Sequence, residues 1–312
     1  MMNLNSYSLL AGDASFRKFY RSSRNSIIVF SKKNKYLNLV VYDAINKFLN
    51  NQKILAPRLY SENYSENYIE IQDFGNQTIF DVLKKKKKKD ILILFKKIIK
   101  LLHQIQSIKV KKIKNFKNKD YKIPFYHKKI LMKEANLFCD WYLKKSYLNI
   151  SKEKFSKDFK KIIKKLLSNL TLKNNVFVHR DFHVSNLMLV NNRIGVIDSQ
   201  DALIGNKAYD LASLIDDVRF KTSKSLKRKI FDFYLKKQSK LQISKFKNDF
   251  EIISVLRNLK IIGIFTRLAL RDRKKKYLKL IPYTWKLINM RIDENKVFFD
   301  LKNLLNQNFK KR

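Results

Sequence analysis

A short run of residues in the second half of the chain combines the side chains that phosphoryl transfer requires. The segment "HRDFHVSN" places Asp181 five positions before Asn186, and a strand-like segment further on ends at Asp198. An aspartate on a loop can accept a hydrogen bond from an attacking hydroxyl and orient it, while an amide oxygen and a carboxylate are ligands that Mg²⁺ prefers. The spacing therefore predicts Asp181 as the catalytic residue, with Asn186 and Asp198 holding Mg²⁺.

The residues between Asn186 and Asp198 predict a hairpin that would bring these two side chains together. The apolar runs "LMLV" and "IGVID" flank the turn signal "VNNR", and short β-rich runs around such a turn are typical of paired strands. The alternative is that the three polar residues only cap turns. The complete H-R-D-x-x-x-x-N pattern with its downstream aspartate favours the catalytic interpretation.

Four further polar residues close to this run in the sequence are candidates for supporting roles. His179 is expected to orient the loop through hydrogen bonds rather than act as a base, and His183 is expected near the acceptor. Asp201 is close enough to Asp198 to face the same cleft, where it would bind substrate or orient the loop. Asp210, in "AYDLASL", is expected to cap a helix or to clamp the catalytic loop.

The elements that must position these residues change in type along the chain. Residues 16–31 predict a hairpin, residues 37–49 a helix, and "YIEIQDFG" a strand that ends at Gly75. After this point the pattern is mainly helical, apart from a strand-like stretch over residues 176–198. The sequence thus predicts an α+β fold with a small β-rich lobe over residues 1–75 and a larger, mainly helical lobe over residues 76–312.

These motifs resemble the protein-kinase superfamily, and within it the aminoglycoside phosphotransferase and choline kinase group. "SQD" follows Asp198 where protein kinases have Phe-Gly, and no Ala-Pro-Glu or activation segment precedes "AYDLASLIDD". The resemblance implies a protein-kinase-like two-lobed fold. Because an activation segment serves to dock protein substrates, its absence points to a small-molecule acceptor.

A narrower resemblance covers nearly the whole chain, from about residue 11 to about residue 285. "GDASFRKFYR", "HRDFHVSNLM", "VIDSQDALIGNKAYDLASLIDD" and "RNLKIIGIFTRLALRD" are similar to segments of the anomeric sugar kinases of bacterial cell-wall recycling. That resemblance implies ATP as phosphoryl donor and the anomeric hydroxyl of N-acetylmuramate or N-acetylglucosamine as acceptor. A kinase for another small alcohol, such as an aminoglycoside or choline, is the competing interpretation.

The phosphates of the nucleotide need backbone amides or cations, yet the chain has only five glycines and no G-x-G-x-x-G. The candidate loop is "GDASFR", which contains Ser15 and Phe16. Its glycine, alanine and serine are small enough for backbone amides to approach an anion. Arg17 and Arg21 follow and would reach phosphate oxygens with their forked donors. Pairing of both arginines with surface carboxylates is the alternative.

Two other features complete the predicted nucleotide site. The strand that carries the phosphate-binding lysine in protein kinases reads "IIVFSKKNK" here, so Lys32 is a second candidate after Arg17. The strand "YIEIQDFG" is expected to present backbone atoms to the adenine between Glu70 and Gln72.

Recognition of the acceptor rests on the resemblance alone. "LMKEANLFCDWYL" resembles a helix that faces the acceptor pocket in this family, which implies that Glu134 binds sugar hydroxyls and that Trp141 packs on a sugar face. Core packing explains Trp141 equally well.

Composition limits the other possibilities. The formal net charge of +43 suggests nucleic acid, but the lysines are scattered and lack interleaved aromatics, so a solvated basic surface is favoured over a non-catalytic scaffold. No apolar run is long enough for a membrane span or a signal peptide, and we expect a cytoplasmic protein. Cys139, the single cysteine, excludes an intrachain disulfide and is expected to be buried. The oligomeric state is left open.

Overall fold

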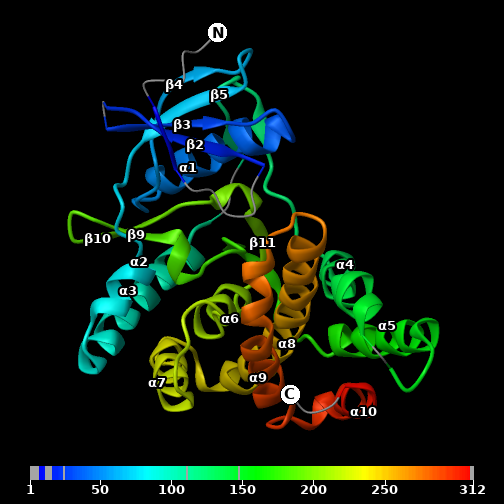
Figure 1. Cartoon of the computed structure of the whole chain (residues 1–312). Coiled ribbons are helices and arrows are strands. Elements are labelled where there is room, and N and C mark those ends of the chain that lie inside the picture. Colours follow the sequence, from blue (N-terminus) through cyan, green and yellow to red (C-terminus); the bar gives the residue numbers. More distant parts are fainter. Residues whose placement is uncertain (1–6, 11–15, 24, 110–111, 147, 310–312) are drawn as a thin grey trace. The chain divides into compact units, whose positions relative to one another are not determined.

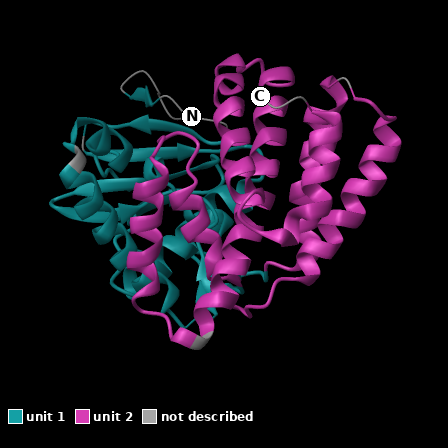
Figure 2. Ribbon diagram, turned by 90° about the horizontal axis from the view of Figure 1, so that it is seen from below, with its two compact units in different colours: residues 1–125, 176–204 teal, residues 126–175, 205–312 magenta. Residues whose placement is uncertain are grey.

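The computed structural model describes residues 7–10, 16–23, 25–109, 112–146 and 148–309. The chain divides into two compact units, which Figure 2 colours separately. Unit 1 contains residues 1–125 and 176–204, and unit 2 contains residues 126–175 and 205–312. Each unit is thus assembled from two separate stretches of the sequence.

Unit 1 is built on a five-stranded antiparallel sheet with the order β1-β2-β3-β5-β4 (Figure 1). Its strands are β1 (Ser8–Leu10), β2 (Lys18–Arg21), β3 (Ser26–Phe30), β4 (Leu59–Asn63) and β5 (Tyr68–Gln72). The predicted hairpin over residues 16–31 is confirmed as β2 and β3, and the predicted strand after residue 67 as β5.

The core of this sheet follows from the alternation of its strands. Side chains of β5 are buried at every second position, so Ile69 and Ile71 face one side of the sheet. With Val29 of β3 they pack against Leu39 and Tyr42, which belong to a helical turn over Tyr36–Val41 and to α1 (Tyr42–Asn51). The expected helix over residues 37–49 is therefore present, with its apolar face on the sheet.

The rest of unit 1 contains the strands next to Asp181, Asn186 and Asp198. Thr78 caps α2 (Ile79–Lys85) by accepting a hydrogen bond from the Asp81 amide at 3.1 Å, and the predicted hairpin over residues 187–196 is confirmed as β9 and β10. The remaining elements of this region are α3 (Lys88–Gln106), β6 (Ile113–Lys114), β7 (Asp120–Tyr121), β9 (Leu187–Val190) and β10 (Arg193–Val196). Two further strands are divided between the units: β8 (Asn174–Val178) begins in unit 2, and β11 (Leu203–Asn206) ends there.

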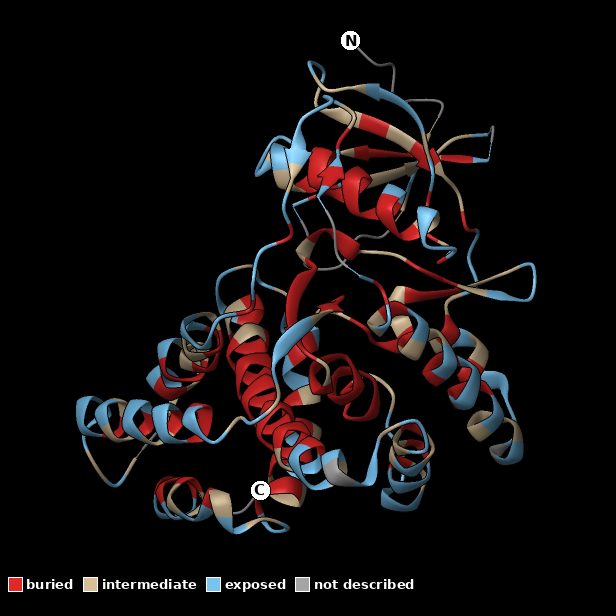
Figure 3. Cartoon of the chain, turned by 180° about the vertical axis from the view of Figure 1, so that it is seen from behind, coloured by how far each residue is buried: buried red, intermediate tan, exposed pale blue. Residues whose placement is uncertain are grey.

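Unit 2 is helical and is organised around one long helix, α8 (Lys240–Leu270). This helix packs against α4, α6 and α9, and its middle is buried on every side, as Figure 3 shows. A helix buried on all sides needs neighbours on all faces. The other helices of unit 2 are α4 (Lys128–Leu137), α5 (Lys152–Ser168), α6 (Ala208–Ile215), α7 (Lys224–Leu235), α9 (Ile281–Ile292) and α10 (Phe299–Asn308).

Buried ion pairs connect the helices of unit 2. Arg291 Nε donates a hydrogen bond to Asp216 Oδ2 at 3.0 Å, and Lys227 Nζ lies 3.2 Å from Asp216 Oδ1. Burial opposes ionisation, but the two cations outweigh it and lower the pKa of Asp216 to about 2. Cys139 is buried as expected, and burial raises the pKa of its thiol to about 12.

The two compact units are divided differently from the expected lobes. Residues 76–125 and 176–204 belong to the same unit as the N-terminal sheet, so the lobe boundary at residue 75 stays a prediction. Among the described helices, none combines the length and the apolar character that a membrane crossing requires.

Candidate active site

The loop after β8 carries Asp181 in an unusual backbone setting. His179 and Arg180 lead from the strand into the loop, and Arg180 has a φ of 76°. The left-handed region disfavours residues with a Cβ by about 1–2 kcal/mol, so the surrounding structure must hold this conformation. The Asp181 carbonyl accepts a hydrogen bond from the His183 amide at 2.9 Å, which makes a tight turn at Asp181.

Asn186 is fixed from both sides. Its side-chain Nδ2 donates to the Asp181 carbonyl at 3.1 Å, and its own carbonyl accepts the Ile197 amide at 3.1 Å. Register in the β9–β10 hairpin pairs Leu187 with Val196. The hairpin therefore brings the Asn186 and Asp198 segments together, as the sequence predicted.

Asp198 lies two residues after the end of β10, and its backbone is also in the left-handed region, with a φ of 67°. Aspartate tolerates this region better than most residues. Its side chain is 35% exposed, so the carboxylate is reachable by a ligand while its backbone is held by the hairpin. Asn186 and Asp198 thus present a neutral and a charged oxygen donor from adjacent backbone segments.

Arg17 is tied to Asp198 through a buried guanidinium. Its Nη2 donates to Asp198 Oδ1, and its Nη1 donates to Gln200 Oε1 at 2.7 Å. The residue is only 4% exposed, and its guanidinium lies 5.0 Å from the ring centroid of Tyr42 and 5.4 Å from that of Phe19. Burial between two rings fixes the cation next to the expected metal ligand.

The segment after Asp198 continues this network. Gln200 Nε2 donates to Asp201 Oδ2 at 2.9 Å, and Arg180 Nη1 lies 3.3 Å from Asp201 Oδ1. Asp201 therefore links the strained residue of the catalytic loop to the segment that carries Asp198. These contacts are compatible with the predicted loop-orienting role of Asp201, and both of its predicted roles stay predictions.

The two histidines of the loop are buried. His179 has no exposed surface, and burial lowers its pKa although Asp181 and Asp198 oppose the shift. A neutral, enclosed imidazole is consistent with the predicted orienting role rather than with proton transfer. His183 is 6% exposed and contributes its backbone amide and carbonyl to the loop.

The donors at this position fit a hard divalent cation. With Nδ2 of Asn186 turned to the Asp181 carbonyl, its Oδ1 points elsewhere and, together with the Asp198 carboxylate, supplies the oxygen atoms that Mg²⁺ prefers. The described part of the chain contains no group of three or more His, Cys, Asp or Glu side chains arranged for a metal. The chemistry of the donors thus suits a metal that also takes ligands from water and phosphate.

The predicted nucleotide-binding residues of the N-terminal strands are placed in different ways. Ser15 lies outside the described residues, while Phe16 and Lys32 are exposed. Arg21 donates from Nε to Asp73 Oδ2 at 2.5 Å and from Nη2 to Asp73 Oδ1 at 3.0 Å. Its fork thus clamps the segment that follows β5, and its role toward a nucleotide stays a prediction.

Glu70 and Gln72 lie on β5, the strand whose backbone atoms were expected to face the adenine. β5 is an inner strand of the sheet, since its backbone pairs with β3 on one side and with β4 on the other. The Gln72 amide donates to the Arg58 carbonyl at 2.8 Å, and the Glu70 carboxylate accepts from the Ser61 hydroxyl at 3.1 Å. A role of these two residues toward adenine stays a prediction.

Three other predicted residues lie in unit 2. Glu134 of α4 is 8% exposed, accepts a hydrogen bond from the Tyr126 hydroxyl, and lies 3.2 Å from Lys260 Nζ. Trp141 is half-buried in the helical turn after α4, and Asp210 is fully buried in the first turn of α6. The carboxylate of Glu134 is thus bound inside its own unit, and the substrate roles of Glu134 and Trp141 stay predictions.

Sequence reasoning missed the residues that surround Asp198. Tyr42 and Asn46 are two polar side chains one helical turn apart on the buried face of α1, and Ser199 and Gln200 directly follow Asp198. One signal was present in the sequence: the helical period of α1 places the Tyr42 hydroxyl and the Asn46 amide on its apolar face, where polar side chains need partners.

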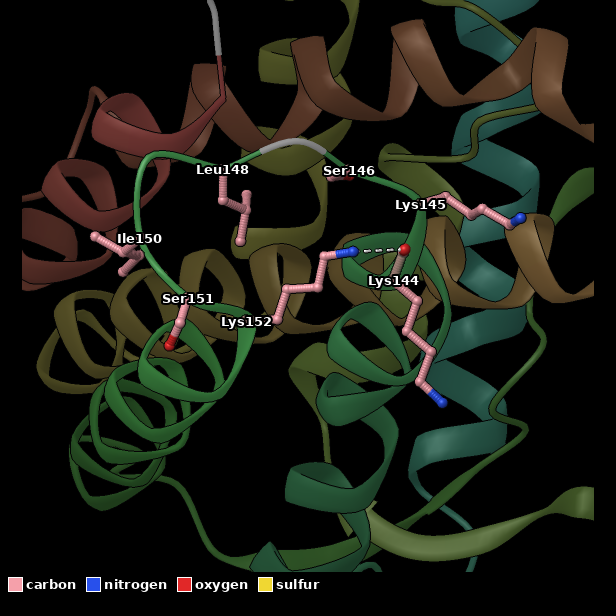
Figure 4. Close-up of a pocket in the computed structure, with 7 residues that line it drawn as sticks. All are labelled: Lys144, Lys145, Ser146, Leu148, Ile150, Ser151 and Lys152. Carbon is pink, nitrogen blue, oxygen red and sulfur yellow. Dashed lines mark hydrogen bonds between the residues drawn. The ribbon is translucent and has the colours of Figure 1, made fainter.

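Two surface hollows lie apart from this centre. One of about 440 Å³ is lined by Lys144, Lys145, Ser146, Leu148, Ile150, Ser151 and Lys152, where Lys152 Nζ donates to the Lys144 carbonyl at 2.8 Å (Figure 4). Another of about 350 Å³ lies beside Lys53, Arg58 and Arg193. Neither includes a predicted site residue.

The family of the chain follows from comparison with known proteins. The model of the phosphotransferase enzyme family matches residues 6–243, a range that contains the catalytic loop, the hairpin and Asp198. The chain belongs to this family.

Curated relatives match over most of their length. An N-acetylmuramate/N-acetylglucosamine kinase of Neisseria meningitidis serogroup B is 28% identical over 87% of this chain and 81% of that protein. One of Pseudomonas aeruginosa is 27% identical over 95% of this chain and 86% of that protein.

Solved structures establish the fold. The crystal structure of the aminoglycoside phosphotransferase APH(2'')-Ib with bound ADP has a TM-score of 0.62 at 18% identity, covering 92% of this chain and 95% of that one. A choline/ethanolamine kinase family protein from Mesorhizobium loti has a TM-score of 0.63 at 9% identity, covering 95% and 92%. The predicted kinase-like α+β fold is confirmed.

Proposed function

We propose that the chain is an ATP-dependent sugar kinase that phosphorylates the anomeric hydroxyl of N-acetylmuramate or N-acetylglucosamine. The observation that carries this proposal is the match, over 87% and 95% of the chain, to relatives named as kinases of these two sugars. The clustering of Asp181, Asn186 and Asp198 in unit 1 supports it, because these residues supply the groups that phosphoryl transfer needs.

Asp181 is the catalytic residue in this proposal. Its carboxylate accepts a hydrogen bond from the sugar hydroxyl, turns the oxygen toward the γ-phosphorus, and takes the proton as the transfer proceeds. The bond between the sugar oxygen and phosphorus forms, the bond from phosphorus to the β–γ bridging oxygen breaks, and ADP leaves with that electron pair. The hydrogen bonds from His183 and Asn186 to the Asp181 carbonyl hold the backbone that carries this carboxylate.

Asn186 and Asp198 are the proposed holders of Mg²⁺, which when bound neutralises charge on the transferring phosphates. Arg17 is the proposed cation for the phosphates in place of the lysine of protein kinases. Its guanidinium is already directed at Asp198 and Gln200, and its forked donors suit phosphate oxygens.

The substrate is tested by measuring ATP consumption with N-acetylmuramate, N-acetylglucosamine, choline and an aminoglycoside, and by reading the phosphorylated position with phosphorus NMR. We expect turnover with the two amino sugars and a product phosphorylated at the anomeric position. Turnover with choline or the aminoglycoside alone would replace the proposed substrate by one of those alcohols.

The catalytic role of Asp181 is tested by Asp181→Asn, which keeps the size of the side chain and removes its basicity. We expect kcat to fall by about 10²–10⁴-fold, with nucleotide binding and thermal unfolding close to those of the unmodified protein. Asp232→Asn, at an exposed position of α7, is the matched control and should leave kcat unchanged. A kcat within threefold of the unmodified protein in Asp181→Asn would contradict the assignment.

A further inference from the structure

Helix α1 is bonded directly to the residue that follows Asp198. The Ser199 hydroxyl donates to Asn46 Oδ1 at 2.6 Å, although the two residues are 153 positions apart in the sequence. Asn46 is 1% exposed and Ser199 is fully buried. Inside a protein such a bond is stronger than at the surface, and breaking one side leaves the other polar group without water.

The same helix reaches the neighbourhood of Asp198 a second time. Tyr42 lies one turn before Asn46 on α1, and its ring centroid is 5.0 Å from the guanidinium of Arg17, which donates to Asp198. Burial raises the pKa of Tyr42 to about 12, with Arg17 acting in the opposite direction. Two side chains of α1 thus bear on Asp198, one through Arg17 and one through Ser199.

The backbone at Asp198 needs such support. Its left-handed φ of 67° turns the carboxylate out of the line of the preceding strand, and a conformation of this kind persists only where neighbouring contacts fix it. The hairpin holds the chain before Asp198 through the bond from the Ile197 amide to the Asn186 carbonyl. On the other side of Asp198, the bond to Asn46 holds Ser199.

We propose that Asn46 and Ser199 are positioning residues that hold the Asp198 carboxylate in its metal-binding orientation. The inference rests on the proposed function, since it assigns to Asn46 and Ser199 a part in binding the metal–nucleotide complex. Without the bond, the backbone after Asp198 relaxes and the carboxylate samples other directions. Partners that orient a metal ligand typically change metal affinity by about 10-fold or more when removed.

The test is the Mg²⁺-dependent gain in affinity for a non-hydrolysable ATP analogue, measured by calorimetry with and without Mg²⁺. In Ser199→Ala we expect this gain to shrink by about 10-fold, while the Mg²⁺-free affinity changes less than twofold. Asn46→Ala breaks the same bond from α1 and should give the same loss. The double variant should lose no more than either single variant, because both remove one interaction.

The control variant is Ser213→Ala, which removes another fully buried hydroxyl, one without a hydrogen-bond partner among the described residues. Ser213→Ala should leave the Mg²⁺-dependent gain in affinity unchanged. Ser199→Thr, which keeps the hydroxyl, should show the gain of the unmodified protein. A gain in Ser199→Ala and Asn46→Ala equal to that of Ser213→Ala would overturn the inference. If the unmodified protein itself shows no Mg²⁺-dependent binding of the nucleotide, the proposed function fails instead.

Discussion

At the scale of single residues, the centre of unit 1 is assembled from strained and buried groups. Arg180 and Asp198 both have positive φ, and Arg17, His179 and Ser199 are each at most 4% exposed. Each of these residues would be unfavourable alone, and each is held by a partner or by the backbone. Residues of this kind gather at functional sites because neighbouring contacts offset the cost of their conformations.

Asp43 gives a prediction about pH. This residue of α1 is 2% exposed, its Oδ2 atom has no hydrogen-bond partner among the described residues, and burial raises its pKa from the ordinary 3.8 to about 6. Since the folded pKa is raised, the contribution of Asp43 to stability is fully present below about pH 4 and is lost as pH rises through 6. The loss by pH 8 is about 3 kcal/mol.

Asp43→Asn removes this titration. We expect the free energy of unfolding of the variant, relative to the unmodified protein, to rise by about 1–2 kcal/mol between pH 5 and pH 8, measured by urea unfolding at both values. The exposed substitution Asp232→Asn serves as control and should show no such rise. A pH-independent difference for Asp43→Asn would mean that the buried carboxylate titrates normally.

At the scale of elements, the packing of α8 on the end of α4 leaves no room at Gly263. A Cβ at this position would lie 2.3 Å from the backbone carbon and oxygen of Leu137. Alanine is favoured over glycine inside a helix by about 1 kcal/mol, but backbone atoms cannot yield as a side chain can. Overpacking of a core typically costs about 1–3 kcal/mol.

Gly263→Ala is therefore expected to lower the free energy of unfolding despite its better helix propensity, by about 1–3 kcal/mol in chemical denaturation. The comparison is with Ser244→Ala, at an exposed position of the same helix, which should leave stability unchanged or slightly raised. Equal stability of Gly263→Ala and the unmodified protein would show that the two helices can separate without cost.

The sequence predicted those elements whose signal is local. The β9–β10 hairpin follows from "LMLV", its turn and "IGVID", and with it the approach of Asn186 to Asp198. The order of strands in the five-stranded sheet depends on contacts distant in sequence, so the burial of β5 between two neighbours was not visible. The bond between Asn46 and Ser199 joins residues 153 positions apart, and no spacing rule connects them.

At the scale of the whole molecule, charge is the dominant feature. The chain carries 69 Lys and Arg against 26 Asp and Glu, and α5 alone presents a row of exposed lysines, among them Lys154, Lys157 and Lys161. Mutual repulsion of like charges destabilises a compact state. Such a surface also attracts anionic nucleotides from solution.

Added salt should therefore stabilise the protein. We expect the Tm to rise between 20 mM and 500 mM NaCl, because the Debye length falls from roughly 20 Å to about 4 Å. The rise should be roughly 1–2 °C for each kcal/mol of repulsion relieved. The measurement is differential scanning calorimetry in NaCl and in KCl at equal ionic strength. An unchanged or falling Tm in both salts would show that attractive ion pairs outweigh the repulsion.

The lone thiol of the chain has a practical consequence. Cys139 is only 6% exposed in unit 2, and burial raises its pKa to about 12, so at neutral pH its thiol stays protonated and largely shielded from solvent in the native state. A thiol-reactive dye can label it only after the helical turn around it has opened. The labelling rate in excess dye therefore reports how often this part of the protein opens, with no engineered probe and no second cysteine to confuse the signal.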